Sequence, residues 1–400
     1  MARINEVIHP WKLANFEEIF ESESTVDAMN ILIAPDKFKG TLSAEEAGSV
    51  IAGVLKEVDG FTVQVLPLAD GGEGTLELFL SKGGRHVEVR VHDPLMRERM
   101  APFGLSADGR TAYAEMARAS GLMLLKPEEF NPLRTTSYGT GELIRRAVET
   151  GAEDIVLGIG GSATTDAGMG MMEALGMRFF DAQGNVLRSC GESLLDIHGV
   201  DETHCLPGLR SVKFLALCDV TNPFYGPDGA AHVYSPQKGA TPGMVDQLDR
   251  GLRHVCNIIK ATQGMDLQQV PGSGAGGGLA GGAVAWLNAS LRPGFDVVAE
   301  WVKLEAMIRW ADVIITGEGK VDAQSLKGKV VSGILRRALP FGKKVMLVCG
   351  QIAGDFPPPD VPVYAMADHV GGHEAWTQPE SSLRRLIAEV VAPDLRKFRE

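Results

Sequence analysis

Short apolar runs alternate with helix-forming segments along this 400-residue chain, and this alternation limits its fold more than any other feature. From residue 29 the sequence predicts a strand at 31–34, a helix at 43–57, a strand at 62–66 and a helix at 74–81. The order returns after residue 290, with "ADVIITGEG" predicted as a strand and a glycine turn, a helix at 330–338 and a strand at 344–349. Such alternation is typical of parallel sheets with crossover helices. The predicted fold class is therefore α/β.

The sequence also predicts two domains. From residue 85 the segments change to shorter strands, at 86–92 and 110–115, around a turn-rich stretch. We predict a discontinuous Rossmann-like parallel-sheet domain of residues 29–84 and 290–400, interrupted by an inserted second α/β domain of residues 85–289. We expect the active site in the cleft between these domains. Residues 1–28 precede the pattern and are predicted to be an N-terminal extension.

Composition argues against several functions. The net charge is -12 and the isoelectric point is near 5.3, which opposes nucleic-acid binding because phosphate contacts require clustered Lys and Arg. The five cysteines form no CxxC pair, which predicts reduced thiols in a cytoplasmic protein. The uncharged stretch 267–291 contains a proline and many glycines, so we expect no membrane-spanning helix there. The expected partners are small molecules.

Three glycine-rich segments follow predicted strands, and each carries acidic residues. They are "PLADGGEGT" (67–75), "GIGGSATTDAGMG" (158–170) and "ITGEGKVDAQSLKGK" (315–329). Glycine lets an anion approach the main chain closely, and backbone N–H groups at a helix start can bind it. Neighbouring carboxylates could hold Mg²⁺, which prefers oxygen ligands. The three segments together predict a site for nucleotide phosphates and Mg²⁺.

A second interpretation of the middle segment stays open at this point. Gly158, Gly160 and Ala163 fit the pattern G-x-G-x-x-[G/A] after a predicted strand at 154–157. Asp181 stands about twenty residues further on, where an acid that binds the ribose of NAD would lie. An NAD-linked dehydrogenase is therefore one alternative, although it leaves the other two acidic glycine segments unexplained. A non-catalytic binding protein is another.

Six segments together resemble the class I glycerate kinase family. They are "ILIAPDKFKGTLSAEEA" (31–47), "PLADGGEGT" (67–75), "GIGGSATTDAGMGMMEALG" (158–176), "CDVTNPFYGPDGAAHVYSPQKGA" (218–240), "PGSGAGGGLAGG" (271–282) and "TGEGKVDAQSLKGK" (316–329). The resemblance implies ATP-dependent phosphorylation of D-glycerate, two α/β domains and a site between them. It favours 2-phosphoglycerate as the product, with 3-phosphoglycerate as the alternative.

The matching segments supply the candidate site residues. Asp219, after a predicted strand at 214–217, is the leading candidate to orient or deprotonate the substrate hydroxyl. A helix or turn cap is its alternative role. Asp36 is the second candidate, and Lys39 is expected to pair with the substrate carboxylate. Glu318 and Asp322 are the candidate metal ligands. The residues predicted to bind substrate or phosphate are Gly71, Gly72, Gly160, Gly161, Ser162, Thr164, Asp166, Asn222, Gly276, Gly277 and Lys329. "AAHVYS", with His232 and Tyr234, is predicted as a strand.

Overall fold

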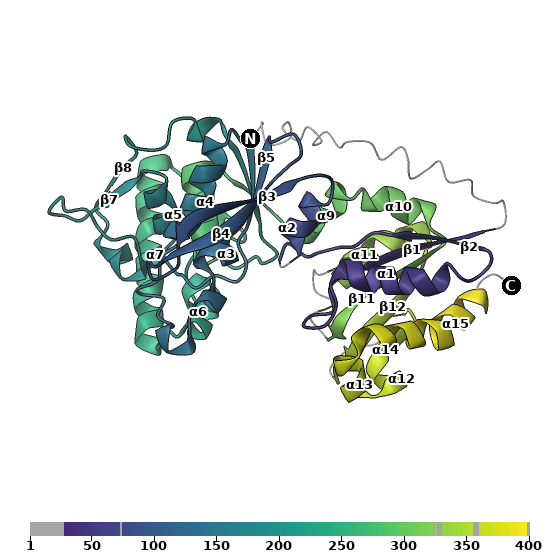
Figure 1. The fold of residues 1–400 in the computed structure, drawn as a ribbon. Helices are drawn as coiled ribbons and strands as arrows, with labels where there is room; N and C mark the ends of the chain where they lie inside the picture. Colours follow the sequence, from purple (N-terminus) through teal and green to yellow (C-terminus); the bar gives the residue numbers. More distant parts are fainter. Residues whose placement is uncertain (1–27, 73, 323–324, 326–329, 355–359, 398–400) are drawn as a thin grey trace. The chain divides into compact units, whose positions relative to one another are not determined.

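A computed structural model describes residues 28–72, 74–322, 325, 330–354 and 360–397, which form two compact α/β units (Figure 1). Unit 1 contains the described residues of 1–67 and 299–400, and unit 2 is the continuous segment Leu68–Val298. Both contain parallel strands and helices, which confirms the predicted fold class. The predicted N-terminal extension, apart from residue 28, lies outside the described residues.

The boundaries between the units differ from the predicted ones. Residues 68–84 and 290–298 belong to unit 2, whereas the sequence pattern assigned them to the first domain. Helix α2 (Thr75–Leu80) stacks its Phe79 on Tyr113 of strand β5 (Thr111–Glu115), with ring centroids 4.5 Å apart. Strand β10 (Ser290–Arg292) pairs with β9 (Lys213–Leu217). These packing partners are distant in sequence, so local pattern could not reveal them.

Unit 1 is built on a five-stranded, all-parallel sheet in the order β13-β12-β11-β1-β2. Its strands are β1 (Met29–Pro35), β2 (Phe61–Val65), β11 (Val313–Val321), β12 (Lys344–Ile352) and β13 (Val363–Ala365). Strand β1 lies between β11 and β2, and its residues Ile31, Leu32 and Ile33 are fully buried. A continuous apolar run is what a strand covered on both faces requires.

The helices of unit 1 pack on this sheet. Helix α1 (Ala44–Leu55) starts at the N-cap Ser43, whose hydroxyl accepts from the backbone N–H of Glu46 in a capping box. It packs against α14 (Pro379–Leu386), so two segments far apart in sequence lie side by side (Figure 1). The remaining helices are α10 (Leu304–Trp310), α11 (Val330–Ala338), α12 (Met366–Val370), α13 (Gly372–Thr377) and α15 (Ala392–Lys397), while α9 (Gly294–Trp301) begins in unit 2.

The sequence predicted that a turn at Gly317 and Gly319 ends strand β11, but the strand continues through these residues. Gly317 and Gly319 lie within the strand, and Glu318 pairs in register with Cys349 of β12. A Cβ atom at Gly317 would lie 1.6 Å from the carbonyl oxygen of Val348, and one at Gly319 would lie 2.8 Å from the backbone nitrogen of Lys39. These glycines therefore allow neighbouring chain segments to pack closely, and the predicted turn is wrong.

Unit 2 contains a six-stranded mixed sheet in the order β10-β9-β6-β5-β4-β3. Strands β3 (Arg85–His92), β4 (Glu98–Leu105) and β5 are antiparallel neighbours, whereas β5, β6 (Asp154–Gly158), β9 and β10 run parallel. Strands β7 (Arg178–Phe180) and β8 (Gly199–Asp201) form a separate two-stranded sheet. The parallel run brings the carboxyl ends of four strands to one edge, where α/β proteins usually bind ligands.

The helices of unit 2 are α2, α3 (Met116–Ser120), α4 (Tyr138–Glu149), α5 (Met169–Ala174), α6 (Ala230–Tyr234), α7 (Pro242–Gln263) and α8 (Leu279–Leu287). Residues 230–234 are helical, so the predicted strand containing His232 and Tyr234 is wrong. The consecutive residues Ala230 and Ala231 are both fully buried, which a strand with one buried face would not allow. No helix in the described part of the chain is long and apolar enough to span a membrane.

Candidate functional site

Four segments of unit 2 converge at the carboxyl edge of its parallel strands. Asp219 follows β9, and its Oδ1 accepts a hydrogen bond of 2.7 Å from the backbone N–H of Gly294, which follows β10. Gly71 lies beside them, because a Cβ atom built there would be 3.5 Å from Asp219 Oδ2 and 2.8 Å from Gly294 Cα. Gly158 ends β6, and the carbonyl oxygen of Gly71 would lie 3.4 Å from a Cβ atom at this position. The structure therefore brings Asp219, Gly71 and the start of the second glycine segment together.

The carboxyl group of Asp219 has unusual electrostatic surroundings. The residue is exposed, yet its neighbours shield the carboxyl group from water enough to raise its pKa to about 6. The charges of Asp70 and Asp296 raise it further, while hydrogen bonds from the backbone of Gly294 and Phe295 oppose the shift. Asp219 is therefore ionised at neutral pH and close to the range of an efficient general base. Its contact with the N–H of Gly294, the first residue of helix α9, is also a helix cap, so the two predicted roles are compatible.

Residues 158–165, which we call the glycine turn, start at the last residue of β6 and contain two exposed glycines. Gly160 and Gly161 are both exposed, and within the described residues their N–H groups have no backbone acceptor. The opposite side of the turn is anchored, because Gly161 O accepts from Leu122 N–H and Ala163 N–H donates to Ser120 O. Gly161 has a φ of +71°, which glycine adopts without strain. Such exposed amides can bind an anion.

The geometry after the glycine turn contradicts the dehydrogenase alternative. A dinucleotide site needs a helix that starts directly at the glycine pattern, but α5 begins only at Met169. Asp181 follows β7 in the separate two-stranded sheet, where its Oδ1 accepts from the N–H groups of Gln183 and Asn185. It therefore caps a local turn and does not end a strand adjacent to β6. The geometry therefore does not fit the alternative interpretation of this pattern as an NAD-binding turn.

Asp166 lies wholly inside unit 2. Its Oδ2 accepts from the backbone N–H and the hydroxyl of Ser137, at 2.7 and 2.8 Å, and also from Gly170 N–H, while Oδ1 accepts from Gly168 N–H. Burial raises the pKa of Asp166, and these hydrogen bonds oppose the shift. All its contacts are donors, as an ionised carboxylate requires. We infer that Asp166 shapes the chain after the glycine turn from within and does not contact a ligand.

Gly276 and Gly277 pack against the backbone of residues 159 and 164. Both have positive φ angles, and a Cβ atom at Gly277 would lie only 2.0 Å from the carbonyl oxygen of Thr164. At Gly276 it would lie 3.4 Å from the carbonyl oxygen of Ile159. The predicted phosphate-binding glycines of this segment therefore pack against the turn's backbone, which only residues without a side chain permit at Gly277.

Asn222 is held by its own neighbours. Its Nδ2 donates to the carbonyl oxygen of Asp228 at 2.8 Å, and its Oδ1 accepts from the hydroxyl of Tyr234 at 2.6 Å. Both ends of the amide are thus engaged in shaping the loop after Asp219. Gly72, also predicted to bind phosphate, donates its N–H to Asp70 Oδ1 at 3.1 Å.

The candidate residues of unit 1 gather at the carboxyl edge of its own sheet. Asp36 follows β1, is buried, and accepts from the N–H of Lys37 at 2.7 Å. The side chain of Lys39 is exposed, and Glu318 lies on the neighbouring strand β11. Asp322 Oδ1 accepts from the N–H of Ser325 at 3.3 Å. Lys329 lies outside the described residues.

No set of three His, Cys, Asp or Glu side chains in the described residues is arranged to hold a metal ion. Mg²⁺ does not need such a set, because it keeps several waters and is usually bound through one or two carboxylates and substrate phosphates. The acids near Asp219 fit this mode, since Asp70 and Asp296 act on it electrostatically. In unit 1, Glu318 and Asp322 are the corresponding candidates.

The sequence analysis did not identify two residues that lie near the site. Glu115 ends β5 beside Gly158, and its Oε2 accepts from Arg118 Nε at 2.9 Å. Lys238 is 1% exposed, and its Nζ donates to Ser162 Oγ and to the carbonyl oxygen of Thr164. One sequence feature could have drawn attention to Lys238. No other Asp, Glu, Lys or Arg stands between Asp228 and Asp246.

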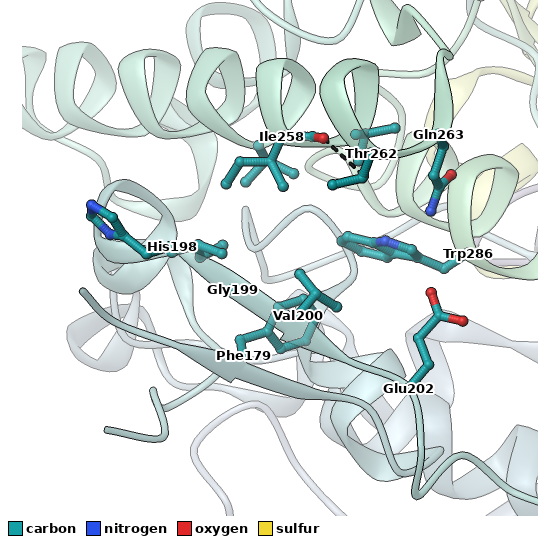
Figure 2. Close-up of a pocket in the computed structure, with 12 residues that line it drawn as sticks. Phe179, His198, Gly199, Val200, Glu202, Ile258, Thr262, Gln263 and Trp286 are labelled. Atoms are coloured by element: carbon teal, nitrogen blue, oxygen red, sulfur yellow. Dashed lines mark hydrogen bonds between the residues drawn. The ribbon is translucent and has the colours of Figure 1, made fainter. Parts of the chain in front are cut away.

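A cavity of about 210 Å³ in unit 2 lies elsewhere, against β8, α7 and α8 (Figure 2). Phe179, Ile258 and Trp286 supply apolar walls, and Glu202 and Gln263 lie on either side of the indole of Trp286 (Figure 2). Its walls, as the described residues define them, include none of the predicted site residues. Volume alone therefore does not locate the candidate site.

An α/β chain with exposed glycine residues and an ionised carboxylate at the same carboxyl edge of parallel strands has the features of an enzyme that transfers phosphoryl groups to small molecules. Comparison with known proteins gives the family. The chain belongs to the glycerate kinase family, whose model matches residues 31–392. This confirms the resemblance and the prediction of an enzyme that phosphorylates an alcohol group.

The relatives match over most of their length. A glycerate kinase of Haemophilus influenzae is 44% identical over 331 residues, which cover 82% of this chain and 87% of that protein. A glycerate 2-kinase of Escherichia coli is 42% identical, covering 82% and 86%. A solved structure of a glycerate kinase 2 from Salmonella typhimurium LT2 matches with a TM-score of 0.82 and 40% identity, covering 93% of this chain and 99% of that one.

Proposed function

We propose that this enzyme transfers the γ-phosphoryl group of ATP to the 2-hydroxyl of D-glycerate, giving 2-phosphoglycerate and ADP. One observation carries the proposal, namely the two exposed glycine amides of the glycine turn in the same unit and at the same sheet edge as Asp219. The choice of hydroxyl rests on the similarity to the Escherichia coli relative, a glycerate 2-kinase. Phosphorylation of the 3-hydroxyl is the alternative.

Asp219 is the proposed base. A carboxylate that accepts the proton of the attacking hydroxyl acts mainly in the transition state, because the hydroxyl becomes acidic only as the new bond forms. The pKa of about 6 leaves Asp219 deprotonated at neutral pH but more basic than an ordinary aspartate. The hydrogen bond from Gly294 N–H fixes the orientation of the carboxylate. Asp36, in unit 1, is the second candidate for this role.

The charged groups of both substrates need partners. We propose that the N–H groups of Gly160 and Gly161 receive an anionic group, either a nucleotide phosphate or the carboxylate of glycerate. The exposed ammonium group of Lys39 is proposed to pair with the substrate carboxylate. The location of the active site between the two domains, and the cytoplasmic location, stay predictions.

Activity is proposed to require Mg²⁺. When bound, Mg²⁺ would neutralise and orient the phosphate oxygens of ATP. The acids around Asp219, and Glu318 with Asp322 in unit 1, are the residues that would hold it. The repulsion that Asp70 and Asp296 exert on Asp219 supports the first set, because a cation there would relieve it.

The proposal is tested by incubating the full chain with Mg-ATP and D-glycerate and following ADP release. A parallel reaction contains NAD⁺ or NADP⁺ and D-glycerate without ATP. We expect ADP release that depends on D-glycerate, and no nicotinamide reduction. Nicotinamide reduction without ADP release would contradict the proposal, and so would binding of the ligands with neither reaction.

A further inference from the structure

Lys238 connects a short helical segment to the glycine turn. It ends the 3₁₀ helix Pro236–Lys238, and its Nζ donates to Ser162 Oγ at 2.8 Å and to the carbonyl oxygen of Thr164 at 2.6 Å. A second contact joins the same two segments, because the hydroxyls of Thr165 and Ser235 lie 2.9 Å apart. The turn is therefore held to this segment by two side chains.

A buried ammonium group is costly unless it is compensated. The charge of Asp166 acts on Lys238, but the carboxylate of Asp166 is occupied by its own donors. Burial lowers the pKa of Lys238 to about 7, and the charge of Asp166 opposes the shift. The remaining polar contacts of the amine are the hydroxyl and the carbonyl of the turn. An apolar residue would avoid this desolvation cost, so a lysine at this buried position indicates a specific role.

We propose that Lys238 is a positioning residue of the kinase: it fixes Ser162 and Thr164, so that the neighbouring amides of Gly160 and Gly161 are held ready for an anion, and its own charge strengthens that binding. This inference deepens the proposed function and rests on it. Lys238 acts through the turn and needs no contact with substrate.

Anion binding at the turn should change the protonation of Lys238, an effect that a purely structural lysine would not show. An anion that arrives at the turn stabilises the ammonium form of Lys238, which raises the affinity of this amine for a proton. At pH 8, above the pKa of about 7, binding of the anion should therefore be accompanied by proton uptake at Lys238. Asp219 can also take up a proton when an anion approaches, so the share of Lys238 must be separated by substitution.

The experiment measures binding by titration calorimetry at pH 8 in buffers of different ionisation enthalpy, with D-glycerate alone and with ATP alone. The proteins are the wild type, Lys238→Met, and Lys213→Met as control. Lys213 is exposed at the amino end of β9, away from the carboxyl edge. We expect proton uptake by the wild type and the control with the ligand that occupies the turn, and a loss of this uptake in Lys238→Met. We also expect kcat/KM to fall by about 10²-fold in Lys238→Met, the scale of a misplaced binding group.

The outcomes separate the inference from the proposed function, because binding does not require turnover. Equal proton uptake in the wild type and Lys238→Met, or kinetic constants that match the wild type, would overturn the role of Lys238. Binding with uptake that depends on Lys238, but without ADP formation from both substrates, would contradict the proposed function and leave the role intact.

If Lys238→Met does not fold, Lys238→Arg replaces it, because arginine keeps the charge but cannot release its proton. It should bind the anion with no uptake at this position, and undiminished uptake would overturn the proposal. Ser162→Ala removes one of the two contacts of Lys238 and should lower kcat/KM about tenfold, the value of one charge-assisted hydrogen bond. Unchanged kinetics in Ser162→Ala would also contradict it.

Discussion

Gly160→Ala probes the glycine turn without disturbing the fold. A Cβ atom at Gly160 would meet nothing within 4 Å, the residue is exposed, and its φ is negative or extended. Alanine therefore fits the folded chain, and we expect a melting temperature equal to or slightly above that of the wild type. If an anion binds at these amides, we expect the new methyl group to obstruct its approach. If it removes one hydrogen bond to a charged group, about 1.5–3 kcal/mol is lost, which corresponds to a fall in kcat/KM of roughly 10- to 10²-fold.

Gly243→Ala is the matched control. Gly243, in the first turn of α7, also has no atom within 4 Å of its Cβ position. Both variants are compared with the wild type by thermal melts and by steady-state ADP release with each substrate varied in turn. Gly243→Ala should keep full activity. Wild-type kinetics in a folded Gly160→Ala would refute the assignment of an anion to this turn.

Three further outcomes are expected. Asp219→Asn should lower kcat by about 10²-fold with little change in the melt, and the activity of the wild type should fall at acidic pH as this carboxylate is protonated. A normal kcat beside a collapsed one in Asp36→Asn would transfer the role of base to Asp36. Excess EDTA should abolish ADP release, and full turnover in EDTA would remove Mg²⁺ from the mechanism. Between pH 7 and 10.5, Lys238 is protonated in the unfolded chain and neutral in the folded chain. This group should therefore make the free energy of unfolding rise with pH by up to about 1.4 kcal/mol per pH unit. Denaturant titrations that give the same pH slope for the wild type and Lys238→Met would contradict this.

Local pattern was sufficient for the main elements of the fold. The central strand β1 and helix α1 were predicted from the alternation of a short apolar run with a helix-forming segment. Prediction failed at β11, where glycine had two possible functions. Gly317 looked like a turn residue, but its role is to let Val348 approach β11, and only tertiary structure reveals that neighbour.

The candidate site was predictable in part for the same reason. Asp219 and Gly160 stand directly after strands, so the sequence could place them at the carboxyl edge of a sheet. Burial could not be predicted, and it separates Asp166, whose donors come from Ser137, from residues that can meet a ligand. Lys238 was missed because its partners on the glycine turn lie more than seventy residues away in the sequence.

The central claim, phosphorylation of D-glycerate by ATP, is tested most directly by phosphorus NMR of the complete reaction. The full chain is incubated with Mg-ATP and D-glycerate, and the spectrum is compared with those of authentic 2- and 3-phosphoglycerate. We predict that ATP signals are replaced by equal amounts of ADP and 2-phosphoglycerate. The 3-phosphoglycerate signal would contradict the proposed position of transfer, and unchanged ATP in the presence of folded protein would contradict the account as a whole.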